Sequence, residues 1–353
     1  MFTPPSADRR LLLHFNENNL GVSPLARQAL EGGLSRVNRY PDAPQTELVA
    51  ALAEHHGVRP QQVVLGAGSS QSIHITVEAV ARRAQDAGQA TQVVMPLPTF
   101  DAGQTAAAAR RLPVRGVPLL DNLEADLLGL RAACEEFAGQ SIVYLCNPNN
   151  PTGTVVSSAE LKAWVTGAPD TFFLIDEAYV EFVDDPRFVA ADAWVREGLA
   201  NVAVVRTFSK LHGLAGLRVG YSLSTAEDAR LFAAFVPEMP VGLPGLLAAR
   251  ASLADTEFQR HSLEQTLEAR GIVVQTLERL GLRYVGPNGN FVFHELPASV
   301  GGNRGYRRRM SELHIAVGRD FPAYGGWNRL SLGTPDEMRY MSAEMMKVLG
   351  CRK

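Results

Sequence analysis

The 353-residue chain is long enough for about two domains, and its 46% hydrophobic and 20% charged residues are typical of a globular protein. A net charge of -3 gives no reason to expect nucleic acid or an anionic membrane as a partner. Cys134, Cys146 and Cys351 show no disulfide or metal-binding spacing, so we expect a reducing, cytoplasmic environment and no metal. No segment resembles a signal peptide or a membrane span.

In chain order, Ser23 and Pro24 predict the start of a helix that continues to about Arg36. Continuous apolar runs then alternate with segments of helical apolar spacing, which predicts a mostly parallel sheet buried on both faces. The predicted strands are residues 62–65, 92–95, 142–145, 172–175, 202–205 and 219–223, and the predicted helices among them include residues 71–87 and 101–111.

The pattern changes after about Pro244. Long helices are predicted over residues 245–280, followed by strands at 290–294, 315–317 and 329–332 and a helix at 335–349. We therefore predict an α/β protein with a large domain over residues 41–243, which contains the mostly parallel sheet. Residues 1–40 and 244–353 are expected to form a smaller α+β domain.

Lys210 is one of only four lysines among 34 basic residues, and it lies in a glycine-rich, apolar segment between Arg206 and Arg218. An amine in this position can form a Schiff base with an aldehyde cofactor such as pyridoxal 5'-phosphate (PLP). The nearby Arg218 should lower the pKa of Lys210 and favour the neutral amine. Thr207, Ser209 and Arg218 are close enough in sequence to bind the cofactor's phosphate.

Polar residues after two other strands match further needs of PLP. A carboxylate must keep the pyridine nitrogen protonated, and Asp176 ends the strand at residues 172–175. Tyr179, and Asn150 in the proline-bearing turn at residues 147–153, can donate to the phenolic oxygen. An N-cap role for Asp176 and a simple rigid turn around Asn150 are the structural alternatives.

A turn before the helix at residues 71–87 is the expected phosphate site. There, backbone amides with Ser69, Ser70 and Gln71 would bind the phosphate at a helix N-terminus. Phe100 suits stacking on the pyridine ring, although a core position explains it equally well. Arg329 suits a bidentate clamp on a substrate carboxylate.

Taken together, these motifs resemble the fold-type I PLP-dependent aminotransferases, and within them the histidinol-phosphate aminotransferase branch. The resemblance covers nearly the whole chain. It is carried by residues 16–18, 21, 23–24, 39–42, 98–100, 147–153, 176–179, 207–218, 290–291 and 329–334.

The resemblance implies the fold-type I PLP-dependent transferase fold and a homodimer in which Tyr40 reaches the cofactor phosphate of the neighbouring subunit. It implies that Asn16, Asn150 and Arg329 bind substrate, and that Arg319 helps to bind a substrate phosphate. It also implies transfer of an amine from an amino acid or amino phosphate to an oxo acid, typically 2-oxoglutarate, with Lys210 as the proton carrier.

Some positions depart from the family pattern. Ser70 and Gln71 replace an acidic pair, Phe100 replaces a tyrosine, and His212 stands where aromatic or hydrophobic residues are common. These changes leave the amino donor open. The basic group made of Arg304, Arg307, Arg308, Arg309 and Arg319 could bind phosphate or face water.

Two alternatives to an aminotransferase remain at this point. The first is a PLP enzyme of the same fold with a different outcome, such as a phospho-amino-acid decarboxylase or an amino-acid oxidase or cyclase. The second is a PLP-binding module without catalysis, which the complete set of Lys210, Asp176, Tyr179 and Arg329 disfavours.

Overall fold

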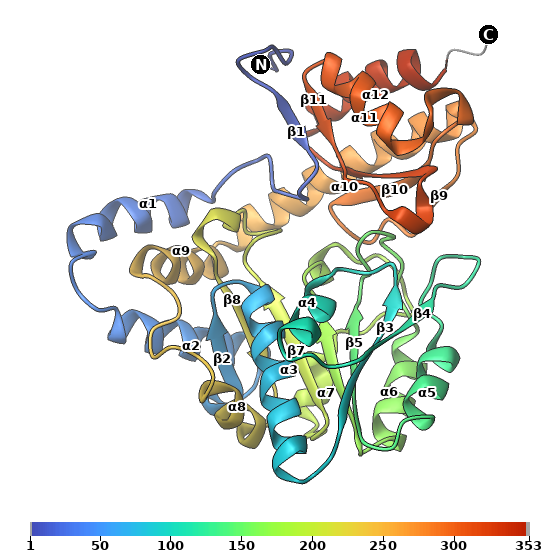
Figure 1. The fold of residues 1–353 in the computed structure, drawn as a ribbon. Helices are drawn as coiled ribbons and strands as arrows, with labels where there is room; N and C mark the ends of the chain where they lie inside the picture. The colour runs from blue at the N-terminus through green and yellow to red at the C-terminus, as the bar shows by residue number, and fades with distance from the viewer. Residues whose placement is uncertain (1, 351–353) are drawn as a thin grey trace.

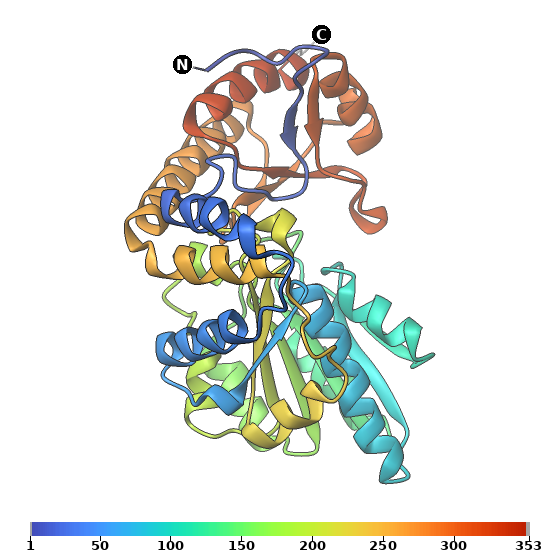
Figure 2. The ribbon, with the colours of Figure 1, turned by 90° about the vertical axis from the view of Figure 1, so that its left-hand side faces the viewer.

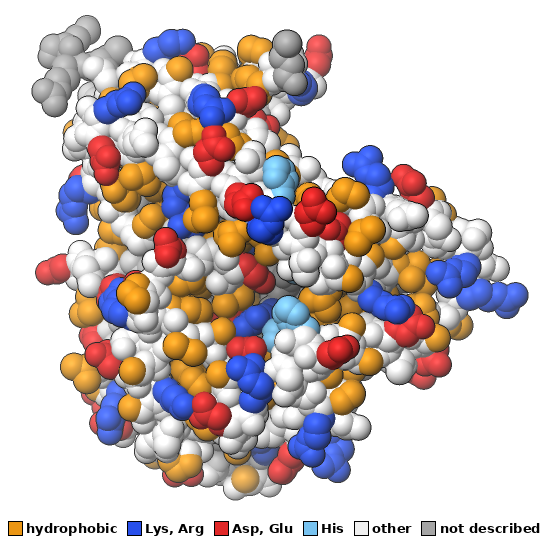
Figure 3. All heavy atoms as spheres, turned by 180° about the vertical axis from the view of Figure 1, so that it is seen from behind, with side chains coloured by type: hydrophobic (Ala, Val, Ile, Leu, Met, Phe, Trp, Pro, Cys, Tyr) orange, Lys and Arg blue, Asp and Glu red, His pale blue; other side chains and the backbone are white. Residues whose placement is uncertain are grey.

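The computed structural model describes residues 2–350, so Met1, Cys351, Arg352 and Lys353 lie outside the described part of the chain. Two lobes are visible, a larger one around a central sheet and a smaller one formed mainly by the C-terminal third (Figure 1). Charges of both signs are interspersed over the face shown in Figure 3. None of the described helices is long and apolar enough to cross a membrane.

The large sheet has seven strands in the order β2-β8-β7-β6-β5-β3-β4. Only β8 runs antiparallel to its neighbours, which confirms the predicted mostly parallel α/β sheet. Six strands fall on the predicted apolar runs, whereas the edge strand β4 is largely exposed and has no such run. The strands are β2 (Val63–Gly66), β3 (Thr91–Leu97), β4 (Val114–Pro118), β5 (Gln140–Cys146), β6 (Thr171–Asp176), β7 (Val202–Thr207) and β8 (Gly220–Leu223).

Helices cover both faces of this sheet. Because side chains alternate along a strand, Val143 and Phe173 join one buried cluster while Ile142 and Phe172 join the other. The helices are α2 (Asp42–His56), α5 (Leu127–Glu135), α6 (Ser158–Gly167) and α7 (Asp192–Arg196) on one face, and α3 (Ser69–Asp86), α4 (Ala102–Ala109) and α8 (Ala226–Ala233) on the other. Burial on both faces explains why these strands are continuously apolar.

The small lobe contains two small sheets, ordered β12-β10-β9 and β1-β11. The pairing of β1 with β11 joins the two ends of the chain, and the short strands β1 and β9 were not predicted. Its elements are β1 (Leu11–Leu13), α10 (Thr256–Leu280), β9 (Tyr284–Val285), β10 (Phe291–Glu295), α11 (Gly302–Glu312), β11 (Ile315–Val317), β12 (Trp327–Ser331) and α12 (Pro335–Leu349).

The N-terminal segment contacts both lobes. While β1 pairs with β11, α1 (Pro24–Gly33) packs against α9 (Leu243–Ala254), as Figure 2 shows. Ala26 of α1 and Leu246 of α9 are buried in a cluster that also contains residues of the large sheet. The domain boundaries expected at residues 40/41 and 243/244 therefore stay a prediction.

A buried ion-pair network connects β6 and β7 near their carboxyl ends. Arg206 on β7 lies 2.7 Å from a carboxylate oxygen of Glu177, directly after β6, and 3.4 Å from Asp192 of α7. Asp192 also pairs with Nδ1 of His56 at 2.9 Å. Burial raises the pKa of Glu177, and the charge of Arg206 opposes that shift. The network fixes the ends of β6 and β7 relative to each other. Asp176 ends β6, and Lys210 follows β7 by three residues.

We predict that Arg206→Met destabilises the protein by about 3 kcal/mol, because Glu177 would keep a buried charge without its cation. Chemical denaturation, followed by far-UV circular dichroism, measures this change. The matched control is Arg82→Met, which removes an exposed pair with Asp86 and should cost less than about 1 kcal/mol. Equal losses in both variants would contradict the prediction.

Candidate active site

The carboxyl ends of several strands of the large sheet meet at one cavity of about 580 Å³. Cys146 ends β5, Asp176 ends β6 and Thr207 ends β7, while Ser69 begins the helix after β2. Of the residues predicted from the sequence, those that line the cavity are Ser69, Ser70, Phe100, Asn150, Asp176, Tyr179, Thr207, Ser209, Lys210, Arg218, Arg319 and Arg329. Asn16, Tyr40 and Gln71 are not among its lining residues.

Asp176 is a buried carboxylate that needs a cationic partner. Its side chain is 1% exposed, and burial raises its pKa to about 6. The hydroxyl of Tyr144 donates to Oδ2 at 3.0 Å and the backbone N–H of Ala178 donates to Oδ1 at 3.2 Å. No ion pair to Asp176 is present among the described residues, so a protonated ring nitrogen in the cavity would stabilise its charge.

Lys210 is held near Tyr179 by the N-terminal segment. Its Nζ donates to the backbone oxygens of Phe15 at 3.2 Å and Asn16 at 3.1 Å, and lies 5.5 Å from the ring centroid of Tyr179. Burial, followed by the charge of Arg329, lowers its pKa to about 8. The pKa of Lys210 is therefore lowered, as the sequence predicted, although burial and the charge of Arg329 contribute more to this shift than the charge of Arg218.

Tyr179 receives two hydrogen bonds at its hydroxyl oxygen. Nδ2 of Asn16 donates at 3.0 Å and Nδ2 of Asn150 donates at 3.4 Å. Burial raises the pKa of the phenol, so its proton is retained at neutral pH and can be donated to a negatively charged oxygen. Asn16 thus contacts the site through Tyr179, and its side chain does not line the cavity.

The turn before α3 is built for close approach of an anion. Gly68 has φ of +81°, and a Cβ there would collide with the guanidinium of Arg218. A Cβ at Gly220 on β8 would collide with the backbone of Gly68 and Ser69, so the turn packs against β8 only because residue 220 is glycine. The turn thereby brings Arg218 to the N-terminus of the 18-residue helix α3.

Hydroxyl groups complete this end of the cavity. The hydroxyl of Thr207 donates to that of Ser209 at 2.8 Å, and both residues are buried. Gln71 has a different place from the one expected, because its Oε1 accepts a hydrogen bond from the backbone N–H of Ala67 at 2.6 Å. Gln71 therefore supports the turn, while Ser69 and Ser70 line the cavity.

Arg329 reaches the cavity from β12, across from the large sheet. Its Nη1 donates to Oδ1 of Asn150 at 2.6 Å, and its Nη2 donates to the backbone oxygen of His14 at 2.6 Å. Burial lowers its pKa from the ordinary value. A buried guanidinium with a nearby open cavity can hold an anionic substrate group with two hydrogen bonds.

The structure adds residues that sequence reasoning missed. Tyr144, which supports Asp176, lies on the neighbouring strand, and its apolar surroundings gave no signal. Asp101 directly follows Phe100, and Nη2 of Arg319 lies 3.3 Å from its Oδ2. Arg307 lines the cavity, so one member of the basic group left open by the sequence faces the site along with Arg319.

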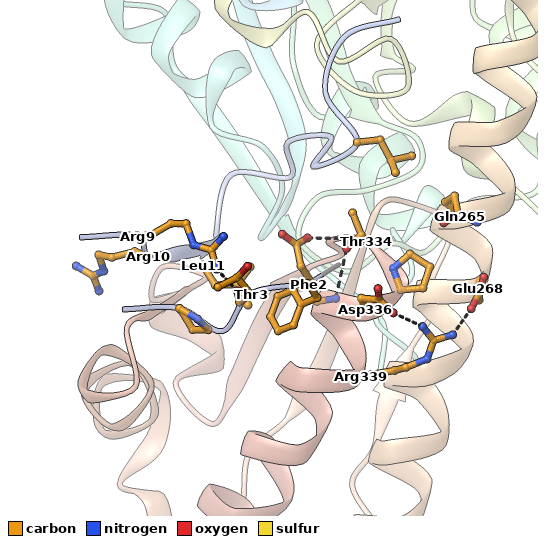
Figure 4. Close-up of a pocket in the computed structure, with 14 residues that line it drawn as sticks. Phe2, Thr3, Arg9, Arg10, Leu11, Gln265, Glu268, Thr334, Asp336 and Arg339 are labelled. Carbon is orange, nitrogen blue, oxygen red and sulfur yellow. Dashed lines mark hydrogen bonds and ion pairs between the residues drawn. The ribbon is translucent and has the colours of Figure 1, made fainter. Parts of the chain in front are cut away.

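A second cavity, of about 520 Å³, lies between the N-terminal segment, α10 and α12 (Figure 4). Three of its charged side chains pair with one another: Arg339 lies 2.7 Å from Asp336 and 2.5 Å from Glu268. Glu337 accepts from the backbone N–H of Thr334, which forms a capping box. These contacts stabilise the start of α12, and none of the residues predicted for the active site lines this cavity.

The donor set of the first cavity fits PLP. A buried carboxylate and an amine of lowered pKa line the same cavity, and Ser69, Ser70 and Arg218 line it at the N-terminus of α3. Asp176 would hold the ring nitrogen, Tyr179 and Asn150 the phenolic oxygen, and Lys210 the aldehyde carbon. The 66–70 turn, Thr207, Ser209 and Arg218 would hold the phosphate.

Comparison with known proteins gives one consistent family. The sequence profile of the family Aminotransferase class I and II matches residues 10–344. Histidinol-phosphate aminotransferase 1 of Dechloromonas aromatica is 34% identical over 335 residues, covering 93% of this chain and 87% of the relative. Histidinol-phosphate aminotransferase of Rubrobacter xylanophilus is 35% identical over 325 residues, covering 91% of this chain and 87% of the relative.

Solved structures agree with the sequence comparison. A crystal structure from Erwinia carotovora atroseptica has a TM-score of 0.94 at 38% identity and covers 98% of both chains. Histidinol-phosphate aminotransferase from Sinorhizobium meliloti, solved in complex with pyridoxal 5'-phosphate, has a TM-score of 0.87 at 26% identity, covering 99% of this chain and 95% of that one. The fold-type I fold expected from the sequence is confirmed.

We predict that PLP binds to cofactor-free protein faster as the pH rises through about 8, and that the rate levels off above that value. Only the unprotonated amine of Lys210 attacks an aldehyde, and the lowered pKa makes this form abundant well below the ordinary lysine pKa of 10.5. Stopped-flow absorbance measures the rate constant. Lys210→Ala is the control and should not develop the visible absorbance band. A rate that still climbs steeply above pH 9 would contradict the prediction.

Proposed function

Because the chain belongs to the class I and II aminotransferase family, we propose that it transfers the amine of histidinol phosphate, or of a closely related amino phosphate, to an oxo acid such as 2-oxoglutarate. The enzyme is a PLP-dependent aminotransferase. The observation that carries the choice of donor is a single cavity in which Lys210 and Asp176 share walls with Arg319 and Arg329.

PLP supplies the electron sink that stabilises negative charge at the substrate carbon. In our proposal the protein contributes orientation and charge to this chemistry. Asp176 keeps the ring nitrogen protonated, because its buried carboxylate is stabilised by a cation there. Tyr179 and Asn150 donate to the phenolic oxygen, and Tyr179 does so as a neutral phenol because burial raises its pKa. Phe100, which also lines the cavity, would stack on the ring.

Lys210 is the proposed proton carrier. With a pKa near 8, its amine can accept a proton and return it at neutral pH, which suits a group that must do both in one cycle. The backbone oxygens of Phe15 and Asn16 hold Nζ within the cavity. Loss of this side chain should therefore abolish turnover and leave the fold intact.

Arg329 and Arg319 are the proposed anchors for the anionic end of the substrate. Arg329 donates to neutral acceptors of the protein, Asn150 and the His14 backbone, and a substrate anion is a stronger acceptor than either. Expulsion of water from the cavity would strengthen this contact. Asn16 acts in this proposal by orienting Tyr179 and Lys210.

We also propose that the enzyme is a homodimer. Tyr40 is 89% exposed and lies outside the cavity, although its motif matches a residue that binds a cofactor phosphate. Leu25, Leu34 and Val37, all on the same N-terminal arm, are exposed as well. Figure 3 shows hydrophobic side chains among the charged ones on the projecting arm. Contact with a second copy would bury this arm and bring Tyr40 to the partner's phosphate site.

We place the enzyme in the cytoplasm. Cys134 and Cys146 are buried free thiols, and burial raises the pKa of both. Neither forms a disulfide among the described residues. Free thiols of this kind are typical of a reducing compartment.

We predict that histidinol phosphate, added without an oxo acid, removes the visible absorbance of the bound cofactor, and that 2-oxoglutarate restores it. Aromatic amino acids, arginine and phosphoserine serve as comparison donors, and Lys210→Ala serves as the unreactive control. Release of carbon dioxide from phosphoserine without any oxo acid would instead indicate a decarboxylase. A response only to an unphosphorylated donor would overturn histidinol phosphate as the substrate.

Mixed dimers test the proposed contribution of Tyr40. We predict that Lys210→Ala and Tyr40→Ala homodimers each have little activity, and that mixing the two subunits restores part of it. In a mixed dimer one site would combine both defects, while the other would have an intact Lys210 and an intact Tyr40. Light scattering of each variant checks that dimers form. Absence of any restored activity in verified mixed dimers would contradict a Tyr40 contributed by the partner subunit.

A further inference from the structure

The two lobes share a small apolar core beside the active-site cavity. Tyr179 of the large lobe and Phe291 of β10 are buried in it, with ring centroids 5.0 Å apart in an edge-to-face arrangement. The guanidinium carbon of Arg329 lies 5.8 Å from the ring centroid of Phe291. The ring of Phe291 therefore contacts both a proposed cofactor residue and the proposed substrate anchor. The other buried members of this core are Ala178, Phe182 and Leu211.

One buried arginine of α10 holds the backbone next to both rings. Nη2 of Arg270 donates to the backbone oxygen of Phe182 and to that of Gly289, each at 3.0 Å. Phe182 lies three residues after Tyr179, and Gly289 lies two residues before Phe291. Because α10 packs against α12 and β10 of the small lobe, the hydrogen bond to Phe182 joins the two lobes.

Arg270 is a buried cation without an acidic partner in the described part of the chain. The residue is 8% exposed, and its buried Nε has no hydrogen-bond partner within residues 2–350. Burial lowers its pKa to about 10, so it stays charged at neutral pH, and the charge of Asp184 opposes that shift. A buried cation without a counter-ion contributes little to net stability, whereas its hydrogen bonds fix geometry. The arrangement therefore indicates a role in positioning.

The turn before β10 docks on the large lobe through Asn288 as well. Its Nδ2 donates to the backbone oxygen of Gly153 at 3.1 Å, and its Oδ1 accepts from the backbone N–H of Asp184 at 3.2 Å. A Cβ at Gly153 would collide with the backbone oxygen of Gly286, so the close approach requires glycine at residue 153. The turn held by Arg270 thus contacts the loop that carries Asn150.

Asn290, the next residue after Gly289, connects this backbone to the N-terminal segment. Its Nδ2 donates to the backbone oxygen of Asn16 at 3.0 Å. The same oxygen accepts from Nζ of Lys210 at 3.1 Å. The backbone next to Arg270 therefore leads directly to a group that holds Lys210 in the cavity.

We propose that Arg270 is a positioning residue for amine transfer, and that it sets the separation between Tyr179 and Arg329 by holding one backbone carbonyl from each lobe. The inference rests on the proposed function in one respect, because it takes Arg329 as the anchor for the anionic end of each substrate.

The shape of the guanidinium suits this role. The two N–H groups of Nη2 point in fixed directions, so they hold two carbonyls at a fixed separation. Bidentate hydrogen bonds to an anion weaken steeply with small changes of distance and angle. A small shift of the strand that carries Arg329 is therefore enough to weaken substrate binding. Lys210 and Asp176 both belong to the large lobe, so their mutual placement would not change.

Steady-state kinetics of Arg270→Met test the proposal. We expect KM to rise about tenfold for both the amino donor and the oxo acid, because both would bind at Arg329. The kcat value and the dissociation constant of PLP should stay within about twofold of wild type. Arg279→Met is the matched control, since Arg279 is exposed on the same helix, and it should leave all of these values unchanged. An unchanged KM in folded Arg270→Met, or an equal loss of PLP affinity, would overturn the positioning role.

Arg270→Gln keeps the test decisive if Arg270→Met does not fold. Its amide is uncharged and shorter, so it cannot hold both carbonyls, and KM should still rise at least about threefold. Arg270→Lys keeps the charge without the fixed directions, so its KM should lie between those of wild type and Arg270→Gln. Thermal unfolding checks that each variant is folded. A wild-type KM in folded Arg270→Gln would overturn the proposal.

Arg329→Met separates this inference from the proposed function. We expect this variant to raise KM for both substrates at least as much as Arg270→Met does, because it removes the anchor itself. An unchanged KM in Arg329→Met would overturn the anchor and the positioning role together. A raised KM in Arg329→Met with a wild-type KM in folded Arg270→Met would overturn the positioning role alone.

Discussion

The buried carboxylate of Asp176 is the constraint on which the active site depends. Burial at the end of β6 raises its pKa to about 6, so a cation in the cavity would stabilise its charge. Tyr144 supports it from β5, and the Arg206–Glu177 pair fixes β6 against β7, which leads to Lys210. The sheet thereby sets the spacing between the carboxylate and the amine before a cofactor binds.

The active site also depends on the N-terminal segment, because its backbone contacts side chains from both lobes. The backbone oxygens of Phe15 and Asn16 hold Lys210 from the large lobe, while that of His14 holds Arg329 from the small lobe. Neighbouring residues of one segment thus connect the cofactor half and the substrate half of the cavity. A shift of one lobe would change both sets of contacts, which relates lobe position to substrate binding.

The placement of the charges separates the two halves functionally. Around Lys210 and Asp176, burial shifts each pKa toward neutrality, as proton transfer requires. At the cavity mouth the guanidinium groups of Arg307 and Arg319 are more exposed, which suits recognition of an anion. Of the departures from the family pattern, Ser70 and Phe100 line the cavity, whereas Gln71 and His212 do not.

The sequence by itself determined most strands of the large sheet and most of the proposed cofactor residues, because local patterns encode both. Continuous apolar runs predicted the buried parallel strands, and the cofactor residues Asp176, Asn150 and Lys210 follow those strands directly. The exposed edge strand β4 and the short strands β1 and β9 lack such patterns. Only the tertiary structure decided that Asn16 contacts Tyr179, that Gln71 supports the turn, and that Arg307 alone of residues 307–309 lines the cavity. These outcomes depend on which side chains distant segments bring together, and no local pattern encodes that.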